Sequence, residues 1–415
     1  MEHSSRTSRL RFLALLPASA LILAGCAAGT GGDSESSKLT VWHYFSDDTQ
    51  VAALVDYKET FEAANEGVEV ENVYVPYDQF SSKLIAGAGS GTGPDVVVFN
   101  GGEAATLAAA GTIQSMDKYW SEYAEADQFP GGVIHKVDDE VYAVQGYVNL
   151  LGLWYNQDIL TEIGVEVPTT IYELTDAMAA AKAAGYEGIT LSGMPQGQGE
   201  WQAYPWLSAN GFTWENLDEA ALTKGYELVK SWVDNGYLSA ESATWDQTVP
   251  FQRFAAGGVA FAENGNWQQG TAAATAEFEY GVAALPIGDE GQVYIGGEAE
   301  SIGAFSTNPD LAWKYLESTF YSADGQLVSL AESGTIPSRI DLAENEAVTS
   351  NALLAGFAQS AANNGANYPQ SAAIPDKVAD LQLTGGQYWS AVISGQMSPA
   401  DAAAKLVVDV KPFLK

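Results

Sequence analysis

The alternation of strand-like and helix-like segments over residues 39–99 constrains the fold of this chain more than any other feature. The strand-like segments are 39–44, 68–75 and 96–99, and the helix-like segments are 48–64 and 77–88. Asp47 and Asp48 can cap the first helix, and the apolar run Val96–Phe99 is typical of a central parallel strand. Strand, helix, strand, helix, strand predicts an α/β domain.

The N-terminus has the composition of a targeting segment. Three Arg residues between positions 6 and 11 precede the apolar run Phe12–Ala24. That run is shorter than the roughly 20 apolar residues that span a bilayer. Leu23-Ala24-Gly25-Cys26 resembles the lipobox of bacterial lipoproteins, which implies cleavage before Cys26 and lipidation of that residue. Cleavage by an ordinary signal peptidase is the alternative.

Downstream of the signal peptide, predicted as residues 1–25, the chain must fold without disulfides. Cys26 is the only cysteine, so stability has to come from a hydrophobic core. Residues 26–38 comprise the lipidated cysteine and a tether rich in Gly, Ser and Thr. The rest of the chain, about 380 residues, is too long for one compact core, which predicts two domains.

The charge of the chain excludes several partners. The formal net charge is −35, and loss of residues 1–25, with three Arg and one Glu, changes it to −37. Nucleic acids need Lys and Arg clusters, so we expect no nucleic-acid partner. The charge also disfavours an anionic ligand and favours a neutral or cationic one. His43 and His135 are isolated and no Cys or His cluster exists, so no metal, cofactor or catalytic residue is expected.

The stretch from Tyr142 to Asn156 is apolar along most of its length but carries polar residues at alternate positions. Gln145, Tyr147 and Asn149 would share one face of a strand. Fully buried strands are instead rich in Val, Ile and Leu throughout. The pattern favours a segment that crosses between two domains through a water-filled cleft; an amphipathic strand facing solvent is the alternative.

Further along, the patterns predict more elements of both kinds. Strands are expected at 188–191, 278–286 and 301–305, and helices at 157–164, from 170 onward, 217–234, 309–320, 323–333 and 399–410. Trp154, Trp232 and Trp313 lie in apolar periodic segments typical of a core. Trp201 lies in a region interrupted by Gly and Pro, where a loop is expected.

Several short motifs follow one another in a fixed order along the chain. They are LTVWHYFS at 39–46, GPDVV at 93–97, LWYN at 153–156, VPTT at 167–170, FAAGGVAF at 254–261 followed by GNW at 265–267, LP at 285–286, GG at 296–297 and GTIPS at 334–338. Their order resembles that in the extracellular solute-binding proteins of ABC importers, in the sugar-binding group that includes maltose-binding protein. The motifs extend over nearly the whole chain after the tether.

The resemblance implies two α/β lobes, each a mainly parallel sheet flanked by helices, with ligand bound between them. Crossings are expected at Asn149, near 297–301 and near Ser338. Lobe 1 would comprise 39–148 and 300–338, and lobe 2 149–299 and 339–415. Such a protein would be a monomer outside the cell, held at the membrane only by lipidated Cys26. It would deliver a carbohydrate, here an oligosaccharide, to the transmembrane subunits of an importer.

Sugars present hydroxyl groups and apolar C–H faces, so the candidate ligand-binding residues are polar or aromatic. Trp267 matches the family's ligand-stacking Trp, with a core position as the alternative. Asn149 stands where relatives place a carboxylate, a departure that leaves the ligand's identity open. Asp47 is a ligand residue or only a helix cap. The other candidates are Tyr44, Asn100, Glu103, Gln145, Tyr147, Trp201, Trp245, Glu298, Glu300 and Tyr368.

Three further functions stay open from the sequence. An exported glycoside hydrolase would also carry Trp and acidic residues, but it needs two carboxylates at a defined separation, which the sequence does not reveal. The sequence is also compatible with a receptor for a non-sugar solute and with an adhesive surface protein. We predict no enzyme activity, because no local catalytic signature is present.

Overall fold

The computed structural model describes residues 37–369 and 372–415, which contain two separate β-sheets. In this part of the chain the larger sheet has six strands in the order β2-β1-β3-β12-β5-β4. Its strands are β1 (Ser37–His43), β2 (Val68–Tyr74), β3 (Val96–Asn100), β4 (Ile134–Val137), β5 (Glu140–Gln145) and β12 (Glu298–Ile302). The predicted signal peptide and Cys26 lie outside the described residues.

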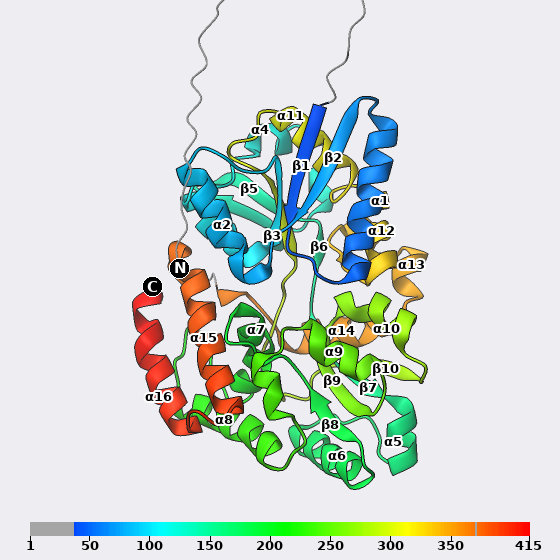
Figure 1. The fold of residues 1–415 in the computed structure, drawn as a ribbon, viewed down its shortest axis with the longest axis vertical. Helices are drawn as coiled ribbons and strands as arrows, with labels where there is room; N and C mark the ends of the chain where they lie inside the picture. The colour runs from blue at the N-terminus through cyan, green and yellow to red at the C-terminus, as the bar shows by residue number, and fades with distance from the viewer. Residues whose placement is uncertain (1–36, 370–371) are drawn as a thin grey trace, which may run out of the picture. The chain divides into compact units, whose positions relative to one another are not determined.

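The first three strands form the predicted βαβαβ unit. β1 pairs in parallel with both β2 and β3, and Figure 1 shows them side by side with α1 (Asp48–Ala64) next to β2. Val96 and Val98 pack into the core on one face of the sheet, and Val97 and Phe99 into the core on the other. An unbroken apolar strand is required at this position because helices cover both faces.

The second sheet has four strands in the described residues, in the order β10-β7-β9-β8. They are β7 (Leu151–Asn156), β8 (Glu187–Thr190), β9 (Val259–Gly265) and β10 (Tyr280–Ala283). Trp154 of β7 is fully buried against Phe251 and Phe357. This sheet has its own large hydrophobic core, so the protein has two lobes, and residues 36–415 together form one compact unit.

Two short strand pairs complete the β-structure of the described residues. β6 (Tyr147–Val148) pairs with β13 (Ile336–Pro337), and β11 (Val293–Tyr294) pairs with β14 (Gly365–Ala366). β6 follows directly on β5 of the larger sheet and precedes β7 of the smaller one. The pair β6–β13 therefore lies where the chain passes between the two sheets.

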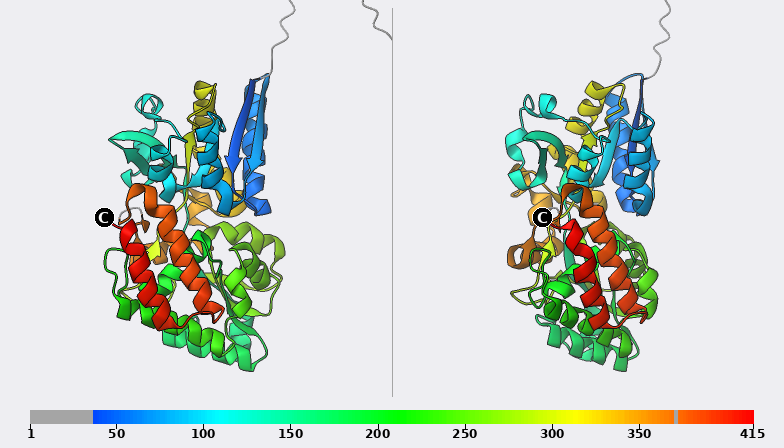
Figure 2. Two further views of the ribbon diagram at one scale, coloured as in Figure 1. Left: turned by 60° about the vertical axis from the view of Figure 1, so that its left-hand side comes forward. Right: turned by 90° about the vertical axis from the view of Figure 1, so that its left-hand side faces the viewer.

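Helices flank both sheets. The remaining ones are α2 (Tyr77–Gly89), α3 (Ala104–Ala109), α4 (Asp117–Trp120), α5 (Gln157–Ile163), α6 (Ile171–Ala183), α7 (Gly197–Ser208), α8 (Glu219–Asp234), α9 (Thr248–Ala255), α10 (Gln269–Thr275), α11 (Pro309–Ser318), α12 (Ala323–Ser333), α13 (Glu346–Thr349), α14 (Ala352–Asn364), α15 (Val378–Ile393) and α16 (Pro399–Val410). Figure 2 shows α15 and α16 packed side by side. No helix among the described residues is both long and apolar enough to cross a membrane.

Several expectations are confirmed in detail. Asp47 caps α1, its side chain accepting a hydrogen bond from the Thr49 amide. The helix expected from residue 170 onward is α6, and Thr170 and Glu173 form a capping box at its start. The predicted core residues Trp154, Trp232 and Trp313 are all buried. Local sequence signals sufficed here because each of these features depends on neighbouring residues.

Three expectations differ from the structure. Both sheets are mixed rather than mainly parallel, because β12 enters the larger sheet antiparallel to β3 and β5, and β7 runs antiparallel to β9 and β10. The strand expected at 301–305 occupies Glu298–Ile302, so its pairing begins before the predicted lobe boundary at residue 300. Trp201 lies in helix α7, not a loop. Pro205 is tolerated inside this helix, which is buried along most of its length.

Candidate ligand-binding site

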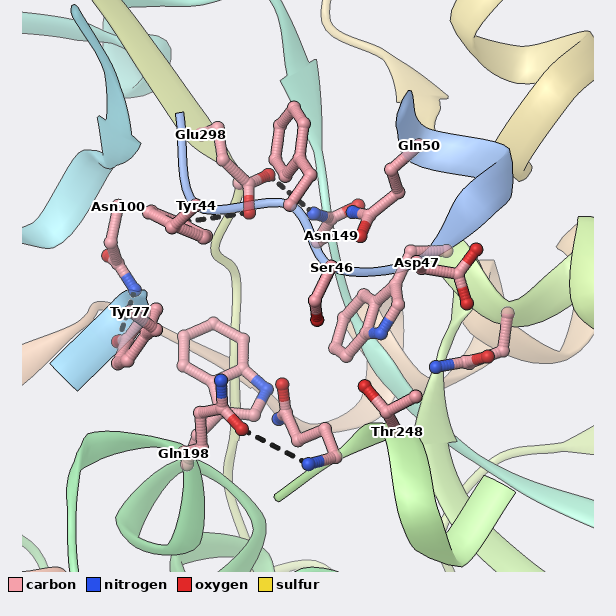
Figure 3. A pocket seen from close by; sticks show the side chains of 16 residues that line it. Tyr44, Ser46, Asp47, Gln50, Tyr77, Asn100, Asn149, Gln198, Thr248 and Glu298 are labelled. Carbon is pink, nitrogen blue, oxygen red and sulfur yellow. Dashed lines mark hydrogen bonds between the residues drawn. The ribbon is translucent and has the colours of Figure 1, made fainter. Parts of the chain in front are cut away.

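A hollow lies between the two sheets, beside the segments that connect them. It is open to solvent on one side, and the empty space that its lining residues border is about 700 Å³ with the open mouth included. Figure 3 shows Tyr44, Asn149 and Glu298 on one side and Gln198 and Thr248 on the other. The lining residues are Tyr44, Phe45, Ser46, Asp47, Gln50, Tyr77, Asn100, Asn149, Gln198, Trp201, Gln247, Thr248, Trp267, Gln268, Gly297 and Glu298.

Backbone geometry brings the lining residues together. Tyr44 to Asp47 directly follow β1, Tyr77 begins the helix after β2, and Asn100 ends β3. The carboxyl ends of these parallel strands meet at one sheet edge, which is where open α/β sheets bind ligands. Trp267 follows β9 of the second sheet. Both lobes therefore contribute to the hollow.

The connecting segments form the floor of the hollow. Asn149 and Gly296 exchange backbone hydrogen bonds of 2.9 and 3.0 Å. Gly297 has a φ of +141°, a backbone conformation that residues other than glycine rarely adopt. A Cβ atom there would also meet the Tyr147 carbonyl. The Gly296-Gly297 pair thus lets two passing segments approach closely beneath the site.

Glu298 is the centre of a hydrogen-bond network at this floor. Its Oε1 accepts from the Tyr44 hydroxyl at 3.0 Å, and its Oε2 accepts from Nδ2 of Asn149 at 2.7 Å. Asn149 Oδ1 in turn accepts from Nδ2 of Asn266 at 3.0 Å. Burial raises the pKa of Glu298 from 4.5 to about 7, and the Tyr44 hydrogen bond opposes part of that shift. The network fixes the side chains that face the hollow.

Two tryptophans contribute to the apolar surface of the hollow, alongside Phe45 and the tyrosines of the lining. Trp267 is 8 % exposed and packs against Gly265, where a Cβ atom would overlap its ring. Trp201 is 7 % exposed, packs against Tyr294 and Tyr368, and has a buried indole N–H without a protein acceptor among the described residues. A buried donor without a partner is costly.

The polar part of the lining is rich in amides and acidic overall. Gln50, Asn100, Asn149, Gln198, Gln247 and Gln268 are all side-chain amides, and Asp47 and Glu298 are carboxylates. No Lys, Arg or His occurs among these lining residues. Amides both donate and accept hydrogen bonds, as sugar hydroxyls do. The chemistry suits a neutral, hydroxylated molecule.

Seven of the predicted ligand residues line the hollow: Tyr44, Asp47, Asn100, Asn149, Trp201, Trp267 and Glu298. Asp47 caps α1 through one carboxylate oxygen and also lines the hollow. Its other carboxylate oxygen accepts a hydrogen bond from the hydroxyl of Thr271 in α10 at 2.8 Å. The two interpretations of this residue are therefore compatible.

Of the three alternating residues predicted to face the cleft at the first crossing, the structure places Gln145 and Tyr147 away from the hollow. β5 ends at Gln145, and the Gly146 amide donates to Glu300 at 2.9 Å instead of continuing the strand. Gln145 therefore contacts His135 at 3.0 Å, and Tyr147 is buried in the first lobe's core. Only Asn149 lines the hollow. The alternation fails because the strand is interrupted.

Four other predicted residues also lie away from the lining. Glu103 accepts from the Ser81 hydroxyl at 2.8 Å, and burial raises its pKa. Trp245 lies under the guanidinium of Arg253. Glu300 is fully buried in the sheet, and Tyr368 is buried behind Trp201.

Sequence reasoning missed nine lining residues: Phe45, Ser46, Gln50, Tyr77, Gln198, Gln247, Thr248, Gln268 and Gly297. Tyr77 follows β2 and could have been found by the strand-end rule that identified Asn100. Gln268 is adjacent to Trp267. No pattern in the neighbouring sequence marks Gln198 or Gln247 as a ligand residue. The backbone N–H of Gln247 donates to Oε1 of Gln198 at 3.1 Å, and only the fold brings these two residues together.

The fold and the hollow define a two-lobed α/β protein of the type found among periplasmic solute-binding proteins. Over residues 56–356 the chain matches the family model described as bacterial extracellular solute-binding protein. The chain therefore belongs to the family of bacterial extracellular solute-binding proteins.

Individual relatives agree with this assignment. The galactooligosaccharide-binding protein of Bacillus subtilis (strain 168) is 25% identical over 322 residues, covering 72% of this chain and 73% of that protein. The GacH receptor of Streptomyces glaucescens GLA.O, solved unliganded and with acarbose, has a TM-score of 0.79 at 24% identity, covering 91% of this chain and 98% of that one.

A solute-binding protein of an ABC transporter from Thermotoga lettingae TMO, bound with alpha-D-tagatose, has a TM-score of 0.81 at 21% identity. The match covers 91% of this chain and 99% of that one. At these identities the two solved structures establish the fold.

Proposed function

We propose that this protein is an extracellular receptor that binds a carbohydrate, specifically an oligosaccharide, in the hollow between its lobes and delivers it to an ABC importer. The lobes close on the sugar, which stabilises the closed state by binding it more tightly than the open one. The receptor acts as a monomer and performs no catalysis.

The observation that carries this proposal is the composition of the lining. Two indoles lie within a set of six amides and two carboxylates, with no cationic side chain in the lining. Aromatic faces suit the C–H surfaces of a sugar, and amides and carboxylates suit its hydroxyl groups. An anionic solute would meet two carboxylates without a counter-charge, so this class is disfavoured.

The relatives support the same ligand class. One is named a galactooligosaccharide-binding protein, and the two solved structures contain acarbose and alpha-D-tagatose. The number of aromatic side chains in the lining, which comprise Tyr44, Phe45, Tyr77, Trp201 and Trp267, favours an oligosaccharide over a single sugar ring.

We also propose that lipidation of Cys26 anchors the receptor to the outer face of the cell membrane. This rests on the sequence LAGC after an apolar segment. The predicted lobe limits are 39–148 plus 300–338 and 149–299 plus 339–415. Because β12 of the larger sheet begins at Glu298, we propose that the boundary lies there, which gives 298–338 to the first lobe and 149–297 to the second.

A thermal-shift screen of residues 36–415 against mono- and oligosaccharides tests the ligand class. A ligand at about 100 times its Kd adds roughly 2.7 kcal/mol to the free energy of unfolding, which is an easily measured shift. If an amino acid, peptide or polyamine raises Tm and no sugar does, the proposed ligand class is wrong.

A glycoside hydrolase is the alternative with a structural observation behind it, since Asp47 and Glu298 both line the hollow. Each of these carboxylates already accepts hydrogen bonds from neutral side chains on both of its oxygens. We therefore propose that these two carboxylates bind the ligand and orient neighbouring side chains, and that they do not catalyse hydrolysis. Cleavage of any oligosaccharide during prolonged incubation would contradict this.

A further inference from the structure

We infer that Gly270 and Thr271, at the start of α10, form a closure contact that sets the affinity of the receptor without touching its ligand. This inference rests on the proposed function, because it assumes that the ligand binds the closed arrangement of the lobes. Neither residue lines the hollow. Both therefore act on binding through the contact between the lobes and through Asp47, which Thr271 orients.

The first observation is a hydrogen bond between the lobes. Thr271 belongs to α10, whose Ala272 packs into the core of the second lobe. Its hydroxyl donates to Oδ2 of Asp47 at 2.8 Å, and Asp47 caps α1 in the first lobe. Asp47 is only 9 % exposed, so this bond to a carboxylate is largely shielded from water.

The same carboxylate faces the ligand hollow. Asp47 lines it, and Oδ1 of Asp47 accepts from the Thr49 amide at 2.9 Å. Hydrogen bonds from both lobes therefore fix the orientation of a lining residue when the lobes are closed. Separation of the lobes would remove the Thr271 bond, so closure and the orientation of Asp47 are coupled.

The second observation is the close approach at Gly270. A Cβ atom at this position would clash with the carbonyl oxygen of Glu332 in α12 and would lie 2.8 Å from Cγ2 of Thr49. Thr49 belongs to α1 of the first lobe, and Glu332 lies near the end of α12, which packs against α1 and places Leu330 in the core of the second lobe. Only glycine permits α10 to approach them this closely, although alanine would favour the helix itself.

The effect of this contact on the apparent affinity follows from the fraction of protein in the closed state. The apparent Kd of a ligand that binds one state equals its intrinsic Kd divided by the fraction of protein in that state. Weakening the contact lowers the closed fraction and removes no side chain from the lining, although Asp47 then loses one of the bonds that orient it. Thr271 is thus a positioning residue, and the loss of affinity should come mainly from faster dissociation.

The test uses Thr271→Val, Gly270→Ala and the control Thr271→Ser in residues 36–415, which form one compact unit. Two readouts are needed: calorimetric titration with a sugar that stabilises the wild type, and the distance between two spin labels. The labels are attached at Val55→Cys on α1 and Tyr172→Cys on α6, which are 40% and 84% exposed. No native cysteine interferes, since Cys26 lies outside this unit.

We expect Thr271→Val and Gly270→Ala each to weaken sugar binding by roughly 10-fold, to raise the dissociation rate and to move the label distance toward an open population. Thr271→Ser should resemble the wild type because it keeps the hydroxyl. If Thr271→Val and Gly270→Ala both keep wild-type affinity and an unchanged distance distribution, the inference is overturned while the proposed receptor function stands. If no sugar binds the wild type but the variants still shift the distance, the contact stands and the proposed function fails.

Discussion

The buried carboxyl group of Glu298 makes a specific prediction about pH. The perturbation is Glu298→Gln, which replaces the acid by a neutral group of the same shape. Glutamine can accept the hydrogen bond from Asn149 through its oxygen and donate to the Tyr44 hydroxyl through its nitrogen. The variant therefore imitates the protonated acid and keeps the network.

The sign and size follow from the pKa of Glu298. Burial raises it from 4.5 to about 7 in the folded protein, so the unfolded chain loses this proton first. The stabilising contribution is present below pH 4.5 and is lost as the pH rises to about 7. The shift corresponds to a loss of about 3 kcal/mol in the free energy of unfolding.

Urea unfolding followed by tryptophan fluorescence at several values of pH measures this difference. Near pH 4 the variant and the wild type should have nearly equal stability. Near pH 8 the variant should be more stable by about 3 kcal/mol, because the wild type then holds a buried charge. Other buried acids such as Glu200, whose pKa burial raises to about 8, titrate in both proteins. A stability difference that is the same at every pH would refute the reasoning.

Three further substitutions test the site and its floor. Trp267→Ala should weaken sugar binding by at least about 10-fold in calorimetry, whereas Trp245→Ala, outside the lining, should leave affinity unchanged; equal effects would contradict the assignment. Gly297→Ala should destabilise the protein by more than about 2 kcal/mol in thermal unfolding, because it adds backbone strain and a backbone clash. The control Gly89→Ala should not destabilise it, because Gly89 has open space around it and no positive φ. Asn149→Ala leaves buried polar partners unpaired and should cost about 1–3 kcal/mol in urea unfolding; an unchanged midpoint would remove it from the network.

The sequence predicted those parts of the fold that depend on neighbouring residues. The βαβαβ unit, the Asp47 cap and the capping box at Thr170 are all local patterns. The antiparallel insertion of β12 between β3 and β5 is not, because it joins residues about 150 to 200 positions apart. Local patterns therefore favoured parallel sheets where mixed ones occur.

The site was predicted in part for the same reason. Strand ends identified Tyr44 and Asn100, because parallel strands place their carboxyl ends at one edge of the sheet. The alternation that suggested Gln145 and Tyr147 is broken at Gly146, whose amide bonds to Glu300. Such a contact depends on tertiary structure and leaves no mark in the local pattern.

Tryptophans illustrate the same limit. Trp201 and Trp245 occupy similar polar stretches of sequence, yet Trp201 lines the hollow and Trp245 packs against Arg253. The helix that carries Trp201 is buried along most of its length, which overrides the Gly and Pro signals in that region. Burial within the complete fold distinguished the two residues.

Hydrogen–deuterium exchange of residues 36–415 across a panel of oligosaccharides tests the central claim most directly. We expect at least one sugar to slow exchange in both lobes at once, at the start of α1 around residues 44–50 and at the end of β9 around residues 265–268. Protection confined to one lobe, or no sugar-dependent protection across the panel, would contradict the claim that a carbohydrate binds between the two lobes.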